Sequence, residues 1–193
     1  MLKLTTPLSE ETIKSLKVGD SVLLSGRIVT ARDAAHKLMV ESKPDFIREY
    51  LKDGVIYHCG PVVKQDNKGE WSFVSAGPTT SSREEPYQST VIGEYGVRAV
   101  IGKGGMGPKT SAGLKEHGAV YMHAIGGSGS ITAACVKKVE HVFMMEEFGT
   151  PEAFWVVQVE DFPVIVTMDA HGGSLHANIL DDSGKVYKDL LDK

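Results

Sequence analysis

The residues with the clearest chemical potential form a glycine-rich segment, Gly102-Lys103-Gly104-Gly105-Met106-Gly107, directly after the apolar run 97–101. Glycines allow backbone N–H groups to approach an anion, and the N-terminus of a following helix adds positive potential. Lys103 adds a full positive charge. The segment alone fits an anion site and a plain strand-to-helix turn with an exposed lysine equally well.

Two nucleotide-binding motifs overlap this segment, and each fails at a required position. The G-x-G-x-x-G spacing is typical of a dinucleotide site, but the next apolar run, 119–124, ends without the acidic residue that binds the ribose. The spacing also approaches that of a P-loop, but Pro108 stands where the lysine must follow. A non-catalytic anion- or nucleotide-binding module is therefore an alternative that rests on the glycine-rich segment alone.

Two other segments place arginine beside hydroxyl or acidic groups. In Gly77-Pro78-Thr79-Thr80-Ser81-Ser82-Arg83, four hydroxyl residues and a guanidinium follow the apolar run 71–76. Arginine can hold a carboxylate with two parallel hydrogen bonds, although a polar turn with a helix cap has the same composition. In Thr30 to His36, Arg32 and Asp33 stand at a strand-to-helix junction, where a surface ion pair explains them in isolation.

Composition limits the class of protein. The net charge of -4 over 193 residues argues against a general nucleic-acid binder, which carries a basic face. No run approaches the roughly 18 apolar residues that span a bilayer, so we expect a cytoplasmic protein with no membrane contact. Cys59 and Cys135 are too few for an all-cysteine iron–sulfur site and predict two buried, reduced thiols with no metal on this chain.

Short apolar runs separated by Gly and Pro predict an α/β fold in one domain over residues 1–193. The alternation of strand and helix between about residues 71 and 124 indicates parallel pairing through crossover helices. More strands than helices flank this region, so we expect a mixed sheet. Predicted strands cover 21–31, 55–59, 71–76, 98–101, 119–124, 154–160 and 164–168. Predicted helices cover 10–16, 33–41, 87–95 and 109–116.

Taken together and in order, these segments resemble the beta subunit, or C-terminal half, of class I fumarate hydratases and L-tartrate dehydratases. The resemblance spans nearly the whole chain, and the combination of GPTT…R with GKGGMG is specific. The matching segments are Ala31-Arg32-Asp33-Ala34-Ala35-His36, Gly60-Pro61, Gly77 to Arg83, Gly102 to Gly107, Gly149-Thr150-Pro151-Glu152-Ala153-Phe154-Trp155 and Asp169-Ala170-His171-Gly172.

The resemblance implies a swivelling β/β/α-type domain that closes over an iron–sulfur cluster carried by a partner alpha subunit, in a hetero-oligomer. The alpha subunit would carry a four-iron–four-sulfur cluster on three cysteines, with one iron open to substrate. By the family pattern, Arg32, Thr79, Arg83 and Lys103 would bind the dicarboxylate, and Thr80 would be the catalytic base. The implied reaction is reversible hydration of fumarate to malate.

Two points stay open within the resemblance. Ser81-Ser82 departs from the Ala-Gly of single-chain fumarases, and tartrate dehydratases often have serine at the first position, so L-tartrate is the alternative substrate. A threonine hydroxyl is a poor base unless strong positive potential or a neighbouring base ionises it. A carboxylate of the alpha subunit could therefore abstract the proton, with Thr80 orienting the substrate. We expect the histidines to be structural.

Overall fold

The structure, a computed structural model, describes residues 1–191, so the last two residues of the predicted domain lie outside it. Most of its strands join one mixed sheet, and β4 and β5 form a separate hairpin. The strands are β1 (Leu2–Thr5), β2 (Ser21–Thr30), β3 (Val55–Tyr57), β4 (Val62–Gln65), β5 (Trp71–Ser75), β6 (Ala99–Gly102), β7 (Val120–His123), β8 (Val136–Phe143) and β9 (Phe154–Met168).

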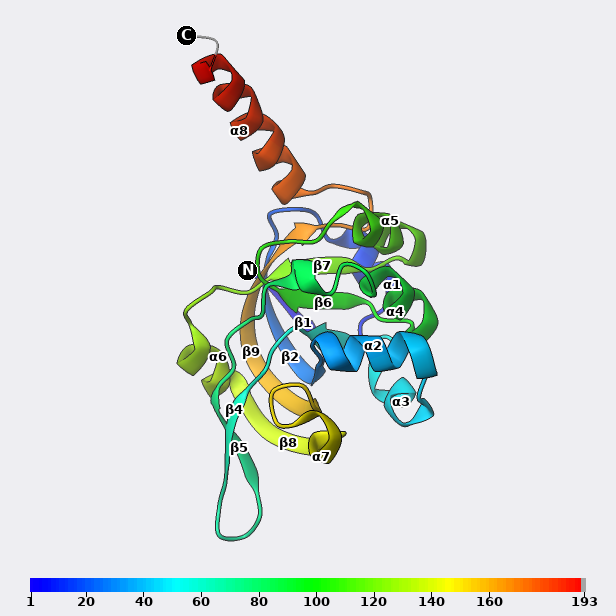
Figure 1. Ribbon diagram of the computed structural model, residues 1–193, viewed down its shortest axis with the longest axis vertical. Coiled ribbons are helices and arrows are strands. Elements are labelled where there is room, and N and C mark those ends of the chain that lie inside the picture. Colours follow the sequence, from blue (N-terminus) through cyan, green and yellow to red (C-terminus); the bar gives the residue numbers. More distant parts are fainter. Residues whose placement is uncertain (192–193) are drawn as a thin grey trace.

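The sheet closes on itself through its last strand. Strands β2, β3, β6 and β7 are parallel neighbours, whereas β9 runs antiparallel to both β7 and β2 and so completes a barrel (Figure 1). Strand β1 pairs with β2, and β8 pairs with β9, outside this ring. The prediction of a mixed sheet is confirmed. Because parallel strands point the same way, the carboxyl ends of β2, β3, β6 and β7 meet at one edge.

Helices provide the crossovers between the parallel strands. Helices α2, α4 and α5 lie together on one side of the barrel (Figure 1), and the prediction of crossover helices is confirmed. The helices are α1 (Glu10–Ser15), α2 (Asp33–Ser42), η1 (Asp45–Ile47), α3 (Arg48–Leu51), η2 (Ser81–Arg83), α4 (Gln88–Tyr95), α5 (Pro108–His117), α6 (Gly129–Cys135), α7 (Met145–Phe148) and α8 (Leu175–Leu191), where η marks a 3₁₀ turn.

Both faces of the central strands are buried, which explains their unbroken apolar sequence. In β3, Val55 and Tyr57 join one apolar cluster and Ile56 joins the other, as the two-residue period of a strand requires. The ring of Tyr57 meets that of Phe162 at a centroid distance of 5.2 Å, although β3 and β9 are not sheet neighbours. The first cluster therefore includes the barrel interior, and the second lies beneath α2, α4 and α5.

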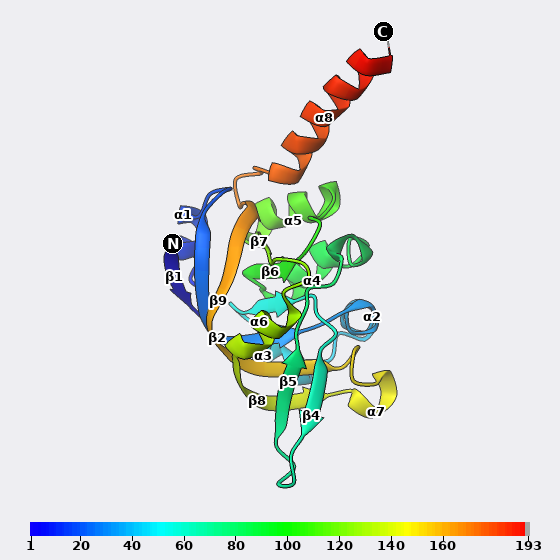
Figure 2. The ribbon, with the colours of Figure 1, turned by 90° about the vertical axis from the view of Figure 1, so that its left-hand side faces the viewer.

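The prediction that residues 71–76 belong to the parallel series is wrong. Strand β5 pairs only with β4, antiparallel, in a hairpin that projects from the barrel (Figure 2). Its burial alternates between half-buried and exposed, because one face packs on the barrel through Trp71 and Phe73 while the other meets solvent. An alternating pattern does not say whether a strand lies inside a sheet or in a ribbon beside it.

The two strands predicted over 154–160 and 164–168 are one continuous strand, β9. Its register with β2 shifts between Leu24 and Gly26, opposite Asp161, which has a positive φ of 48°. A β-bulge bends a strand without ending it, so β9 can curve around the barrel through a segment that contains Pro163. The gap between the two predicted strands, residues 161–163, coincides with this bend.

Helix α8 projects away from the barrel, at the opposite end of the molecule from the β4–β5 hairpin (Figures 1 and 2). It contains no buried residue, and no helix was predicted over this range from the sequence. Among residues 1–191, no helix combines the length and the apolar character needed to cross a bilayer.

Trp155 ties the β4–β5 hairpin to the barrel, so its truncation should weaken the whole fold. The side chain is fully buried, its ring meets those of Trp71 and Phe73, and its Nε1–H donates to Thr150 O at 2.9 Å. We expect Trp155→Ala to lower the free energy of unfolding by about 3–5 kcal/mol because it leaves a large cavity. Urea denaturation followed by circular dichroism measures this.

The control ends the chain after Leu180 and so removes most of α8. Because α8 buries no residue, we expect this truncation to change the free energy of unfolding by less than about 0.5 kcal/mol. Equal losses in the two proteins would contradict the assignment of the core.

Candidate active site

The sequence-predicted site residues gather at the carboxyl edge of the parallel strands. Arg32 follows β2 and Lys103 follows β6, while His58 and Gly60 follow β3, which lies between them. In α/β sheets this edge is the usual location of ligand sites, because loops from several strands converge there. The order of the strands alone therefore brings Arg32 and Lys103, which are 71 positions apart in the sequence, to the same edge.

The chain segment after the hairpin brings the two threonines to the same edge. The Thr79 N–H donates to His58 O at 2.6 Å, and the Lys103 N–H donates to Thr79 O at 3.2 Å. Ser81 N–H then donates to Lys103 O at 3.0 Å, and Thr80 forms a parallel bridge with Lys103. These backbone bonds fix Thr79 and Thr80 beside Lys103. Thr80 is exposed and makes no side-chain capping bond to η2.

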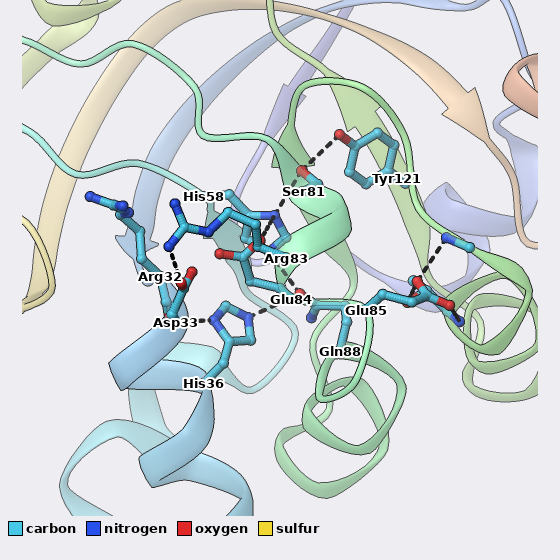
Figure 3. Close-up of polar contacts among 12 residues, drawn as sticks. Arg32, Asp33, His36, His58, Ser81, Arg83, Glu84, Glu85, Gln88 and Tyr121 are labelled. Carbon is cyan, nitrogen blue, oxygen red and sulfur yellow. Dashed lines mark hydrogen bonds and ion pairs between the residues drawn. The ribbon is translucent and has the colours of Figure 1, made fainter.

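A buried hydrogen-bonded chain anchors this segment from below (Figure 3). The Tyr121 hydroxyl donates to Ser81 Oγ at 2.9 Å, and Ser81 Oγ lies 2.8 Å from His58 Nδ1. His58 Nε2 lies 2.7 Å from Gln88 Oε1, so a neutral imidazole with its proton on Nε2 lets every group donate to the next. Ser81 is fully buried here. It holds the turn in place and does not face a substrate at the surface.

Gly102 makes this packing possible. A Cβ atom at position 102 would collide with Ser81 Oγ and would lie 3.1 Å from both His58 Nδ1 and the Tyr121 hydroxyl. The first glycine of the motif is therefore required because the serine turn packs directly against the backbone of β6, not because of an approaching phosphate.

The three predicted cations differ in their partners. Arg32 Nη2 pairs with Glu152 Oε1 at 3.3 Å, whereas its buried Nε has no partner within residues 1–191. Arg83 Nη2 pairs with Asp33 Oδ2, and the bond is drawn in Figure 3. Lys103, which is half-buried, has no acidic partner in this part of the chain. The structure brings Arg32, Arg83 and Lys103 to one edge, and the Arg32–Asp33 pair suggested by the sequence does not form.

The N-terminus of α5, which follows the glycine-rich segment, already holds an internal anion. Glu85 accepts the backbone N–H groups of Gly107 at 2.7 Å and Lys109 at 3.0 Å, and it accepts the N–H and hydroxyl of Thr110 at 3.2 and 2.7 Å. This carboxylate satisfies the donors that a phosphate would need. The N-terminus of α5 therefore already holds an anion of this chain, and within residues 1–191 the Lys103 side chain beside it has no acidic partner.

A glutamate of this chain also contacts the N-terminus of α2. Glu152 Oε2 accepts the Ala34 N–H at 3.1 Å while its other oxygen binds Arg32. A Cβ at Gly60 would collide with the Arg32 guanidinium, so Gly60 leaves room for this arginine. One glutamate thus both caps the helix and sets the direction of a predicted substrate-binding cation.

The predicted structural role of the histidines holds for His36 and His58. Both are fully buried, and burial lowers the pKa of each imidazole, so both stay neutral at pH 7. His36 Nδ1 lies 2.9 Å from Arg32 O and its Nε2 lies 3.0 Å from Gln88 Oε1. They connect α2, β3 and α4 behind the site.

The cysteines are poorly suited to hold iron. Burial raises the pKa of the Cys59 thiol to about 12, so it does not supply the thiolate that metals bind. Cys135 is half-buried, and burial raises its pKa as well. Residues 1–191 contain no group of three His, Cys, Asp or Glu side chains placed to hold a metal ion.

Sequence reasoning missed the acidic residues of the site. Glu84, Glu85 and Glu152 hold the helices and cations in place, and Asp33 pairs with Arg83 rather than with its neighbour. Nothing in the sequence distinguishes Glu84 from the adjacent Glu85, yet Glu84 faces the interior and Glu85 faces α5. Glu84 directly follows the 3₁₀ turn η2 and Glu85 lies in the turn after it, so the path of the backbone there decides which side chain faces the interior.

Comparison with known proteins shows which family this chain resembles. A family model described as "Fumarase C-terminus" matches residues 1–179. A Geobacillus stearothermophilus protein named "Putative fumarate hydratase class I" is 50% identical over 93% of this chain, which spans 34% of that relative's length. The L(+)-tartrate dehydratase subunit beta of Escherichia coli (strain K12) is 39% identical over 90% of this chain and 86% of its own length. The chain belongs to the family described by the fumarase C-terminus.

Proposed function

We propose that this chain is the beta subunit of a two-chain iron–sulfur hydro-lyase that reversibly hydrates fumarate to malate. The observation that carries the proposal is the exposed edge where Lys103, without an acidic partner in residues 1–191, lies beside Thr79 and Thr80. Arg32 and Arg83 stand at the same edge. The similarity to relatives named as a fumarate hydratase and a tartrate dehydratase subunit supports it.

The chain's own contribution is to bind and orient a dicarboxylate. Arg32, Arg83 and Lys103 neutralise the carboxylates, and Thr79 donates a hydroxyl hydrogen bond. Cations placed before the reaction also stabilise the negative charge that builds as a carbon-bound proton leaves. Fixing both ends of the substrate determines which hydrogen faces the base, so much of the acceleration is positional.

Thr80 is the residue of this chain proposed as the base. Its exposed hydroxyl is not used as a cap, and its bridge partner Lys103 carries a positive charge. Positive potential favours the ionised form of a hydroxyl, which is otherwise too weak a base. A carboxylate from the partner remains the competing base, with Thr80 then orienting the substrate.

The iron–sulfur cluster is assigned to a partner alpha subunit. The buried Cys59 thiol and the absence of a three-ligand group in residues 1–191 do not fit a cluster on this chain. The partner would cover the edge that carries Lys103, and together the two chains would form a hetero-oligomer.

The second candidate substrate is L-tartrate. The relative named as a tartrate dehydratase subunit aligns with this chain over most of its own length. The serine at position 81 does not favour it through direct contact, because Ser81 is buried against His58 and Tyr121. Both substrates are dicarboxylates, and the same cations would bind either one.

An anaerobic assay of the chain alone and mixed with a cluster-bearing alpha subunit tests the proposed function. We expect no turnover by the chain alone, and interconversion of malate and fumarate by the mixture, because the binding groups and the cluster lie on different chains. Ultraviolet absorbance of fumarate follows the reaction. Turnover of L-tartrate alone would establish the second candidate, and a cluster-loaded mixture inert on all three acids would refute the hydro-lyase proposal.

Replacement of Thr80 tests its role as base. We expect Thr80→Ala to lower kcat by about 10²- to 10⁴-fold, the usual contribution of a positioned base. The matched change at the neighbouring hydroxyl, Thr79→Ala, should act mainly on KM because Thr79 is assigned to binding. Near-normal kcat in Thr80→Ala would transfer proton abstraction to the partner.

Replacement of Lys103 tests the dicarboxylate-binding edge. We expect Lys103→Met to raise KM by about 10- to 100-fold, because a charge-assisted hydrogen bond contributes about 1.5–3 kcal/mol. Steady-state kinetics with malate measure the change. Lys109→Met removes an equally charged side chain six residues later, exposed on α5, and should leave KM unchanged. Equal effects of the two variants would show that general charge, rather than position, attracts the substrate.

A further inference from the structure

Glu84 is an acidic side chain in a fully buried position behind the site. It follows η2 directly, is 0% exposed, and neither carboxyl oxygen has a hydrogen-bond donor within residues 1–191. Its carboxyl group meets that of Asp33, whose inner oxygen Oδ1 is also buried and without a donor (Figure 3). Three carboxyl oxygens therefore share one buried space.

The neighbouring groups cannot neutralise this pair from inside. The Arg83 guanidinium pairs with the outer oxygen of Asp33, Oδ2. His58 Nδ1 lies 3.9 Å from Glu84 Oε2, but this nitrogen is bonded to Ser81 and the imidazole is neutral. Two ionised carboxyl groups whose facing oxygens are buried and without donors repel each other strongly, even though Arg83 pairs with the outer oxygen of Asp33. A single proton held between the facing oxygens is therefore the stable arrangement.

We propose that Glu84 holds a proton, donates it to Asp33 Oδ1, and so positions Arg83, which Asp33 holds through its other oxygen. Glu84 is a positioning residue in this scheme, because it reaches the substrate only through Asp33 and Arg83. The proton sharing stands on the buried geometry alone. Its effect on dicarboxylate binding rests on the proposed function.

The charges around the pair agree with this assignment of the proton. Burial, followed by the hydrogen bond and charge of Asp33, raises the pKa of Glu84 to about 8. Burial alone would raise the pKa of Asp33 too, but the hydrogen bond from Glu84 and the charges of Arg83 and Arg32 bring it below its usual value. Tyr121, also near Glu84, stays protonated because burial raises its pKa.

Ionisation of Glu84 should weaken binding of the dicarboxylate by Arg83. Above about pH 8 the pair carries a second negative charge beside Arg83. The guanidinium is then held more tightly by the pair, and the positive potential at the edge falls. We expect KM for the dicarboxylate to rise through this pH range while kcat changes less.

The stability of the full chain alone tests the proton without any assay of activity. The folded-state pKa of Glu84 is raised above the unfolded value of 4.5, so between about pH 4.5 and 8 the unfolded state releases a proton that the folded state keeps. Stability from this group is therefore lost as pH rises through that window. Relative to Glu84→Gln, which cannot ionise, the folding equilibrium constant of the natural chain should fall by between about tenfold and a thousandfold.

Denaturant titrations at several pH values measure this difference, and a constant offset caused by the amide does not affect its slope. The matched control is Glu11→Gln, an exposed glutamate of α1, which should keep the slope of the natural chain. If Glu84→Gln also kept that slope, the proton on Glu84 would be excluded.

Infrared spectroscopy of the natural chain gives a measurement that needs no variant. We expect the C=O stretching band of a protonated carboxyl group at pH 7, with loss of the band as pH rises through about 8. Its absence at pH 7 would overturn the proposal even if Glu84→Gln failed to fold.

Kinetics of the complex with the cluster-bearing partner test the link to Arg83. The rise of KM above about pH 8 should be absent in Glu84→Gln. If the variant still showed that rise, Glu84 would have no role in substrate binding. An inert complex, together with the stability slope and the infrared band, would refute the proposed function and leave the proton-sharing pair established.

Discussion

The antiparallel return of β9 between β7 and β2 is the constraint on which the rest of the structure depends. Strand β9 closes the ring formed by β2, β3, β6 and β7, whose parallel pairing places their carboxyl ends at a common edge. The bulge at Asp161 allows a single strand to make that turn. Arg32 and Lys103, far apart in sequence, lie at the same edge because of this strand order rather than any local motif.

Close contact between the backbones of the turn after β5 and of β6 determines where the side chains at this edge lie. The turn after β5 inserts beside β6 through reciprocal backbone bonds between Thr79, Ser81 and Lys103. The buried Ser81 hydroxyl then completes a chain from Tyr121 to Gln88, and Gly102 has to lack a side chain for the serine to fit. The outward direction of Thr80 follows from the inward direction of Ser81, since consecutive residues of an extended segment face opposite sides.

Internal carboxylates divide the electrostatic tasks of the site. Glu85 accepts the backbone N–H groups at the N-terminus of α5, and Glu152 accepts the Ala34 N–H in the first turn of α2, so these donors are already used inside the chain. Of the three proposed substrate-binding cations, Lys103 is the one with no acidic partner in residues 1–191. Asp33 pairs with Arg83 through one oxygen and meets the buried Glu84 carboxyl group through the other, so in the proposed scheme the position of Arg83 depends on a proton as well as on the charge of Asp33.

The central elements could be predicted from the sequence, because buried strands and amphipathic helices carry their periods locally. The strands β2, β3, β6 and β7 and the helices α1, α2, α4 and α5 lie where their apolar patterns predict them. The sequence also indicated the family, whose model matches residues 1–179. It could not place β5 outside the sheet or join the two halves of β9, since an alternating strand looks the same in a hairpin as in a sheet, and a bulge looks like a break.

The contacts of each polar residue at this edge could not be predicted from the sequence and depend on the folded arrangement of the strands. Three neighbours of the same turn, Thr80, Ser81 and Glu84, are respectively exposed, hydrogen-bonded in the core, and paired with a second buried carboxyl. The partner of Arg83 is Asp33, fifty residues earlier, and the anion at the glycine-rich loop is Glu85. Hydrogen bonds and ion pairs act over a few ångströms of space with no period along the chain, so their partners exist only once the barrel has closed.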